Sequence, residues 1–308
     1  MNQTIFDPAT PQAEKILGLT YGFIIAALAI LLLVISLTVY IAVKFGRKNN
    51  DMEPRQVSGN RKLEVLMIVG PLLLVAGFFL WSVRTVSAIM PERVLQKPNV
   101  IITGHQWWWQ ADYPGTKVTT ANEIHLPVGK AMLVELRSAD VIHELWIPQL
   151  GPKMDTVPGM PNHLVLQADE VGEYLGDCAE YCGAGHAWMR LRVVVQTPQD
   201  FEAWERGQAK PTLVVVNSDQ RGRTLFQSQT CIQCHSIEGV SVTGNVGPDL
   251  THFGSRVTLG AGVLDNTPAE LHRWLSDPQS VKPGCYMPNM RLNSTEIDDL
   301  TAYLEASK

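Results

Sequence analysis

The sequence predicts a multidomain chain: a transmembrane helical hairpin, then a small β domain, then a small all-α domain. Three observations lead to this prediction. Two long segments without a charged residue lie near the N-terminus, over residues 16–43 and 65–83. Residues 99–197 alternate strand-like segments with Pro and Gly turns, and the residues after 220 carry helix-start signals. We therefore expect an N-terminal segment with the hairpin at 1–98, a β domain at 99–197, a linker at 198–219 and an α domain at 220–308.

Composition limits the class of protein. At 308 residues the chain is longer than one ordinary domain. Its net charge of −5 argues against nucleic-acid binding, which requires concentrated positive charge. Charged residues make up only 18% of the chain, below the average for soluble proteins, as expected when long segments are uncharged.

Both uncharged segments are long enough to cross a membrane, because ~20 helical residues span the ~30 Å hydrocarbon core. We expect spans at about 18–43 and 63–86. Buried core helices are an alternative, but no neighbouring segment is amphipathic enough to cover them. A signal peptide is disfavoured, because Asp7 and Glu14 precede the first segment and only Lys15 is basic there.

The loop between the predicted spans is basic, which sets the orientation. It carries six basic residues against two acidic ones: Lys44, Arg47, Lys48, Arg55, Arg61 and Lys62 against Asp51 and Glu53. The positive-inside rule places such a loop in the cytoplasm. We therefore expect a bacterial inner-membrane (plasma-membrane) protein whose termini and later domains lie on the extracytoplasmic, periplasmic side.

Local patterns divide the rest of the chain. A short Pro-bounded connector is expected at 89–98, and the predicted linker contains a helix-prone stretch at Asp200–Gln208. Strands without intervening helices predict a β-sandwich or barrel. In the α domain two helix starts are marked by an N-cap and an N3 glutamate, at Thr267 to Glu270 and at Asn293 to Glu296.

Two of the five cysteines lie in Cys231-Ile-Gln-Cys234-His235, the attachment signature of haem c. Two thiols at this spacing reach the two haem vinyl groups, and the next histidine binds the iron. A redox dithiol is the alternative for a bare Cys-x-x-Cys motif, and the adjacent histidine disfavours it.

The sixth iron ligand is expected in the segment from Pro283 to Met290. Met287 is favoured because it lies between prolines on a stiff loop, and thioether ligation raises the haem potential. Met290 is the alternative ligand, and otherwise packs at the haem edge. Cys285 is interpreted as a bystander.

A second cluster of metal-binding residue types lies in Cys178-Ala-Glu180-Tyr-Cys182-Gly-Ala-Gly-His186-Ala-Trp-Met189, with His143 upstream. Two cysteines and two histidines can hold one tetrahedral zinc ion. With the methionine they can instead hold two copper ions bridged by both thiolates, whereas mononuclear blue copper needs one cysteine and two histidines. The spacing leaves zinc and dinuclear copper open. The neighbouring haem domain favours copper, because zinc does not change oxidation state and cannot exchange electrons with a haem.

Together these motifs resemble cytochrome c oxidase subunit II of the type with a fused C-terminal cytochrome c. The resemblance runs nearly from end to end, through the hairpin, Gly104-His-Gln-Trp-Trp-Trp109, Lys153-Met-Asp-Thr-Val-Pro-Gly159, the cysteine loop and Gly247-Pro-Asp-Leu250. It implies a cupredoxin-like Greek-key β-barrel that holds the dinuclear copper centre CuA, followed by a class I cytochrome c domain.

The resemblance also implies the role of each ligand. His143 and His186 would be the terminal copper ligands, and Cys178 and Cys182 the bridging thiolates. Met189 and the Glu180 carbonyl would be weak axial ligands. The Glu180 carboxylate would reach a magnesium ion at the boundary with subunit I.

Two further residues gain roles from the resemblance. Trp107 matches the tryptophan through which electrons enter, whereas an aromatic belt at the membrane surface suits Trp108 or Trp109 better. Glu64, at the cytoplasmic start of the second span, would be the mouth of a proton-uptake pathway. Its alternative role is an interfacial glutamate paired with Arg61 or Lys62.

The function implied is electron entry into a cytochrome c oxidase. Electrons from a cytochrome c or a quinol-oxidising complex would pass from haem c to CuA, and then to haem in subunit I, which reduces O₂ and pumps protons. Subunits I and III are the expected partners. A nitric oxide reductase of the same superfamily is the alternative, and a zinc-stabilised module with a plain cytochrome is a rival from another class. Nitrous oxide reductase is disfavoured by the two spans, and a quinol oxidase subunit by the copper ligands.

Overall fold

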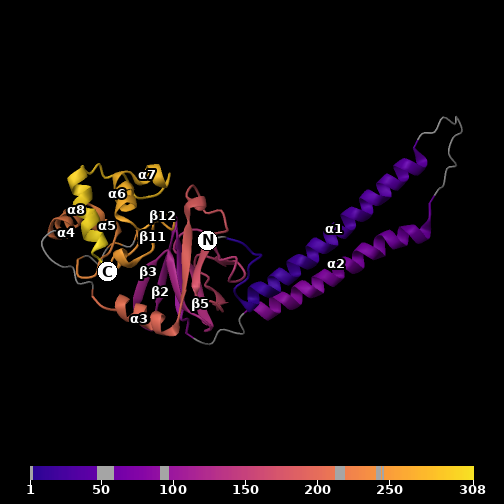
Figure 1. Cartoon of the computed structure of the whole chain (residues 1–308), viewed down its shortest axis with the longest axis horizontal. Coiled ribbons are helices and arrows are strands. Elements are labelled where there is room, and N and C mark those ends of the chain that lie inside the picture. Colours follow the sequence, from indigo (N-terminus) through magenta and orange to yellow (C-terminus); the bar gives the residue numbers. More distant parts are fainter. Residues whose placement is uncertain (1–2, 47–58, 91–96, 212–218, 241–243, 245) are drawn as a thin grey trace. The chain divides into compact units, whose positions relative to one another are not determined.

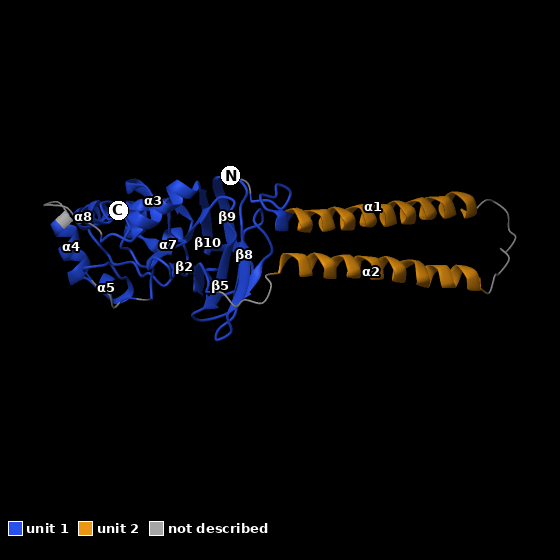
Figure 2. Cartoon of the chain, turned by 90° about the horizontal axis from the view of Figure 1, so that it is seen from below, with its two compact units in different colours: residues 1–13, 91–308 blue, residues 14–90 orange. Residues whose placement is uncertain are grey.

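The computed structural model describes residues 3–46, 59–90, 97–211, 219–240, 244 and 246–308. The chain divides into two compact units (Figure 2). Residues 14–90 form one unit, and residues 1–13 with 91–308 form the other.

The smaller unit contains two long helices, α1 (Pro11–Phe45) and α2 (Arg61–Ile89). Both are long and apolar enough to span a membrane, and their most apolar windows contain no buried residue. Each extends beyond its predicted span at both ends. Asn60 caps α2, because its side chain accepts hydrogen bonds from the amides of Lys62 and Leu63. Within the unit, the Phe23 ring stacks on Phe78 at a centroid distance of 4.2 Å.

Parts of two predicted segments lie outside the described residues. In the basic loop between the predicted spans, five charged residues lie outside the described part: Arg47, Lys48, Asp51, Glu53 and Arg55. The other three, Lys44, Arg61 and Lys62, are described. The middle of the predicted connector, residues 91–96, falls there as well.

The β domain consists of two five-stranded sheets (Figure 1). The first has the order β3-β2-β1-β5-β8: Val118–Ala121, Trp108–Tyr113, Val100–His105, Met132–Ser138 and Asn162–Leu166. The second has the order β4-β10-β9-β6-β7: Glu123–Pro127, Arg190–Gln196, Gly172–Cys178, His143–Trp146 and Met154–Thr156. The pairs β1–β5 and β4–β10 are parallel and the other pairs are antiparallel. These crossovers between sheets confirm the predicted cupredoxin-like β domain.

Alternation along the strands builds the core of this domain. In β1, and in β5 as far as Leu136, every second residue is buried, as period-2 strands with one covered face require. The predicted linker begins as helix α3 (Pro198–Gln208), and this helix packs on the β domain. Phe201 is buried there, and Trp204 stacks on His125 at 4.0 Å. Residues 212–218 of the predicted linker lie outside the described residues.

The C-terminal part is helical, as predicted. It contains α4 (Asp219–Ser228), α5 (Cys231–Cys234), α6 (Pro268–Ser276), α7 (Pro278–Val281), α8 (Ser294–Glu305) and the short strands β11 (Thr258–Leu259) and β12 (Leu264–Asp265). Thr267 caps α6, and Asn293 with Glu296 forms a full capping box on α8, so both predicted helix starts are confirmed. Helices α4, α6 and α8 enclose an apolar core around Phe226, Leu271 and Tyr303.

Candidate metal centre and haem pocket

The copper-ligand candidates come from neighbouring parts of the second sheet. His143 begins β6 and Cys178 ends β9, and these strands pair with Leu145 opposite Cys178. Cys182 follows in the loop after β9. His186 begins a 3₁₀ helix, His186–Trp188, and Met189 is the last residue before β10. One loop and one strand end therefore bring together residues up to 46 positions apart in sequence.

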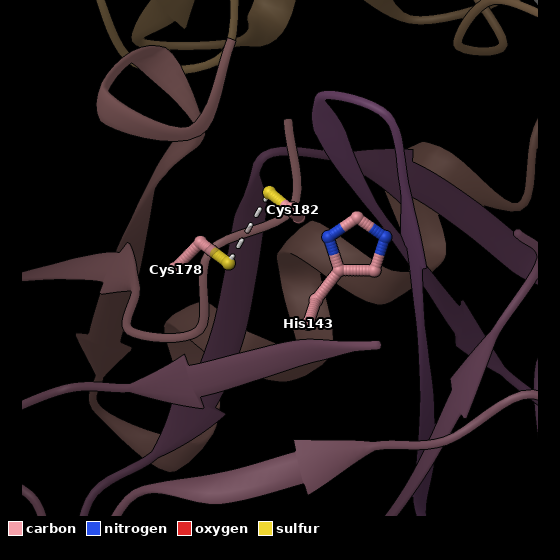
Figure 3. A group of neighbouring side chains, drawn as sticks. All are labelled: His143, Cys178 and Cys182. Carbon is pink, nitrogen blue, oxygen red and sulfur yellow. Dashed lines mark hydrogen bonds between the residues drawn. The ribbon is translucent and has the colours of Figure 1, made fainter. Parts of the chain in front are cut away.

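The side chains converge closely. The Cys178 and Cys182 sulfurs are 3.7 Å apart, and one imidazole nitrogen of His143 lies within 4.8 Å of both (Figure 3). The Cys182 sulfur also lies 3.7 Å from Nδ1 of His186 and 3.9 Å from Sδ of Met189. His143, Met189 and both cysteines are buried. All five predicted side-chain ligands therefore meet around one pair of sulfurs.

Asp140 fixes the tautomer of His143. Nε2 of the imidazole donates to Oδ1 of Asp140 at 2.8 Å, which leaves Nδ1 as the lone-pair nitrogen. Nδ1 is buried and has no hydrogen-bond partner among the described residues. Burial opposes ionisation of Asp140, yet hydrogen bonds from His143 and from the amides of Gln106 and Val141 lower its pKa. A carboxylate behind a histidine with a free inward nitrogen is the usual support for a metal-binding histidine.

The two thiols favour a cationic occupant. The hydrogen bond from Cys182 lowers the pKa of Cys178, and the same contact raises the pKa of Cys182. A second thiolate beside the first is therefore costly unless positive charge lies between them. The Glu180 carbonyl oxygen, 3.2 Å from the Cys178 sulfur, adds an oxygen donor. The donor set of two sulfurs, two imidazoles, a thioether and a carbonyl fits bridged copper ions.

The carboxylate of Glu180 belongs to a separate acidic group. Carboxylate oxygens of Glu144, Asp155 and Glu180 lie within 4.8 Å of one another. Lys153 donates to Glu144 at 2.9 Å and neutralises part of this charge. The carbonyl of Glu180 therefore lies at the cysteine pair, whereas its carboxylate lies with Glu144 and Asp155.

An apolar cavity of about 490 Å³ lies at the Cys-x-x-Cys-His motif. Cys231 and Cys234 are the first and last residues of the one-turn helix α5, and both line the cavity with His235. Its remaining walls include Phe226, Leu250, Phe253, Leu271, Trp274, Leu300 and Leu304. A flat macrocycle with apolar faces fits such walls, and two free cysteines lie ready for attachment.

His235 is oriented for iron ligation. Its Nδ1 donates to the Pro248 carbonyl at 2.8 Å, which leaves Nε2 as the free lone-pair nitrogen. Burial lowers the pKa of His235, which favours the neutral imidazole that a metal requires. Gly247 makes room for the ring, since a β-carbon there would lie 2.5 Å from Cε1.

Both candidate methionines line the cavity but in different settings. Met287 packs against the apolar core of the domain, and its sulfur accepts a hydrogen bond from Trp274 Nε1 at 3.2 Å. The Met290 sulfur lies 3.8 Å from Thr230 Oγ1. Both methionines are half-buried, and the choice of Met287 as the axial ligand stays a prediction. Cys285 is half-buried and accepts a hydrogen bond from Gln279 Nε2 at 3.3 Å.

Trp107 contacts both sites. Its indole Nε1 donates to the Cys182 carbonyl at 2.9 Å, and its ring lines the haem cavity. The ring packs against Gly185, where any side chain would overlap it, since a β-carbon there would lie 2.4 Å from Cδ2 of Trp107. Trp109 is buried in the core of the β domain, and Trp108 is buried with Ala121 and with Ala261 of the C-terminal α domain. The suggestion that either belongs to a membrane-surface belt is therefore wrong. Trp108 stacks on His105 at 4.1 Å.

Comparison with known proteins decides the family. The family model described as cytochrome C oxidase subunit II, transmembrane domain, matches residues 1–84, and the one for its periplasmic domain matches 115–197. A cytochrome c model matches 220–308. Cytochrome c oxidase subunit 2 of Alkalihalophilus pseudofirmus is 36% identical over 321 residues, covering 100% of this chain and 91% of that relative. The chain belongs to the cytochrome c oxidase subunit II family.

Other relatives share parts of this subunit II. Cytochrome c oxidase subunit 2 of Bacillus sp. strain PS3 is 32% identical over 275 residues, covering 83% of this chain and 77% of the relative. Quinol oxidase subunit 2 of Bacillus spizizenii is also 32% identical, over 214 residues that cover 66% of this chain and 65% of the relative.

Membership fixes the coarse function. This subunit II is part of an oxidoreductase and is a two-span membrane protein. Its cytochrome c domain implies haem, and its subunit II periplasmic domain implies CuA. The two clusters of donors described above are the places in this chain that fit these groups.

Glu64 belongs to the hairpin unit of subunit II. It occupies the first turn of α2, and its amide donates to the Asn60 carbonyl at 2.9 Å. A carboxylate in a first turn is stabilised by the helix dipole. Its position at the start of the second predicted span is as expected, and the proton-uptake role stays a prediction.

Sequence reasoning missed several residues that support these sites in subunit II. Asp140 could have been found as a carboxylate three residues before a candidate metal histidine. Gly247 was singled out only as part of a family motif. Lys282 and Tyr286 carried no signal of their own, because their contacts are with residues far away in sequence.

Proposed function

We propose that this subunit II receives electrons at a haem c held by Cys231, Cys234, His235 and Met287, and passes them to a CuA centre. CuA would be held by His143, Cys178, Cys182, His186, Met189 and the Glu180 carbonyl. From there electrons continue to haem in subunit I, which reduces O₂ and translocates protons. When bound, the haem and the copper pair supply one-electron redox chemistry at the two ends of this path.

The position of Trp107 carries the proposal. Its ring is part of the wall of the haem cavity, and its indole donates directly to the carbonyl of the bridging-ligand candidate Cys182. One side chain therefore joins the two donor clusters, which supports Trp107 as the residue of electron entry. Trp107 is also buried, so packing holds its ring in place for this role.

The other residues hold and tune the two sites. Asp140 keeps the Nδ1 lone pair of His143 available, and Pro248 does the same for Nε2 of His235. Around a bound haem the apolar walls of the cavity would exclude water. Buried thiolates within 3.7 Å of each other can bridge two ions.

Further parts of the proposal concern the membrane complex. The basic loop would lie in the cytoplasm of a bacterial cell, with the redox domains outside. The Glu180 carboxylate, near Glu144 and Asp155, would bind magnesium at the boundary with subunit I, since hard cations prefer carboxylates. Glu64 would open the proton-uptake path. Subunit III and an upstream cytochrome c or quinol-oxidising complex complete the expected partners.

Metal analysis of the whole chain tests the proposal. Purified from copper-replete cells that attach haem c, it should hold two coppers and one covalent haem. His143→Ala and Cys182→Ser should lose copper and keep haem. His163→Ala is the matched control, because His163 lies on β8 and pairs with Glu135 instead. One zinc and no copper in the unaltered chain would overturn the CuA assignment.

A further inference from the structure

The cytochrome c domain makes specific polar contacts with the β domain inside the larger unit. The buried carboxylate of Glu123 in β4 accepts hydrogen bonds from the amides of Val257 and Thr258, at 2.6 and 3.0 Å. The Arg190 amide, at the start of β10, donates to the Ala261 carbonyl at 3.1 Å. These bonds use main-chain groups of a loop that begins before β11, so they fix that loop in one register.

Lys282 crosses the same boundary. It is 4% exposed, and its ammonium donates to the Trp107 carbonyl at 2.5 Å and to the Gly260 carbonyl at 3.4 Å. Burial lowers the pKa of Lys282 to about 8, because a cation is less stable away from water. The nearer acceptor of the Lys282 ammonium is the carbonyl of Trp107, the residue that also donates a hydrogen bond to Cys182 in the copper loop.

Tyr286 makes the second contact, one residue before the axial-ligand candidate Met287. Its hydroxyl donates to Oε1 of Gln106 at 2.8 Å, and its ring lies 5.0 Å from the Trp107 ring, centroid to centroid. Between Lys282 and Tyr286 the loop passes close to the copper loop. Gly284 has a φ of +82°, and a β-carbon there would lie 3.3 Å from Ala184.

The haem cavity itself is closed by both domains. Gln106, Trp107 and Trp108 of the β domain line it together with residues of the cytochrome c domain. If the cytochrome c domain moved freely on its linker, this part of the cavity wall would be lost each time it left the β domain. The geometry therefore favours a domain that works from one docked position.

We propose that Lys282 and Tyr286 are positioning residues that hold the Met287 loop against Trp107, so that electrons reach the copper domain from a docked cytochrome c domain. This inference rests on the proposed function and adds to it how the two domains are held. One electron passes from the reduced haem to the oxidised copper pair, and no bond forms or breaks. The linker then limits separation but does not deliver the haem by diffusion.

The test compares the whole chain with Lys282→Ala/Tyr286→Ala, Tyr286→Phe and Lys308→Ala. Tyr286→Phe keeps the ring and loses only the bond to Gln106, and Lys308→Ala removes an exposed lysine. Copper and haem contents are measured first. If each chain holds two coppers and one haem, the proposed function stands, and amide exchange and electron-transfer rates then test docking alone.

Docking has a readout that does not depend on electron transfer: hydrogen exchange of the amides of Arg190, Val257 and Thr258. In the unaltered chain and Lys308→Ala they should be protected, and in the double variant they should exchange at least tenfold faster. Flash-induced electron transfer from haem to copper should slow at least tenfold in the double variant and less than twofold in Lys308→Ala, with Tyr286→Phe between the two. Transfer at the unaltered rate in the double variant, or unprotected amides in the unaltered chain, would overturn the proposal.

Discussion

Gly247→Ala should damage the haem site through a single methyl group. A β-carbon at this position would lie 2.5 Å from Cε1 and 2.8 Å from Nδ1 of His235, whereas ordinary contact begins at 3.4 Å. The imidazole must therefore move by about 0.9 Å, the difference between 2.5 and 3.4 Å. Its bond to the Pro248 carbonyl is 2.8 Å long, so a shift of that size along the bond ends it. Overpacking of this kind costs about 1–3 kcal/mol.

The measurement is the melting of the haem absorption bands in the whole chain, with the low-spin spectrum as a report on histidine ligation. A loss of about 1–3 kcal/mol should lower the melting temperature of a domain this small by roughly 4–24 °C. Gly207→Ala in α3 is the control, because a β-carbon there meets nothing within 4 Å. If Gly247→Ala melted and absorbed like the unaltered chain, the account of how Gly247 makes room for His235 would be refuted.

Three other predictions concern the path from proton uptake to copper. Met287→Ala should abolish the sulfur-to-iron charge-transfer band and lower the haem potential, while Met290→Ala leaves both nearly unchanged; the opposite pattern would make Met290 the ligand. Glu64→Ala should slow turnover of the assembled oxidase several-fold with normal copper and haem spectra, and unchanged turnover would leave Glu64 a helix-end carboxylate. Electron transfer from haem to copper should be independent of protein concentration and change less than about threefold between low and 0.5 M salt, because salt screens exposed charges and not the buried Glu123 and Lys282. Stopped-flow or flash kinetics at increasing salt check this, and a steep dependence would contradict it.

The sequence predicted the features that depend on local spacing. Uncharged length predicted both helices of the hairpin, and the Cys-x-x-Cys-His motif predicted three residues that line one cavity. The cluster around Cys178 and Cys182 was predicted because its loop is short and its residue types are unusual. In each case the residues that predict the feature lie close together in one segment of the sequence.

Contacts between distant segments could not be predicted. Lys282 and Trp107 are 175 positions apart, and Glu123 and Val257 are 134 apart, so no periodicity connects them. A membrane-surface belt was the alternative offered for Trp108 or Trp109, because aromatic residues are common there. The structure instead buries Trp109 in the β domain and Trp108 against Ala121 and Ala261, one from each domain. Helix α3 looked like part of a linker because its composition is polar, yet Phe201 is buried and Trp204 stacks on His125 of the β domain.

The shared wall of the haem cavity has a consequence for redox measurements on pieces of this protein. Gln106, Trp107 and Trp108 shield one side of the cavity from water while the domains stay together. Water stabilises the more highly charged oxidised iron, so a haem that loses such shielding is harder to reduce. A cytochrome c domain cut free at residues 212–218 would therefore show a lower reduction potential than the same haem in the whole chain. Values measured on the excised domain would then misstate the driving force available to the intact oxidase subunit at the donor end.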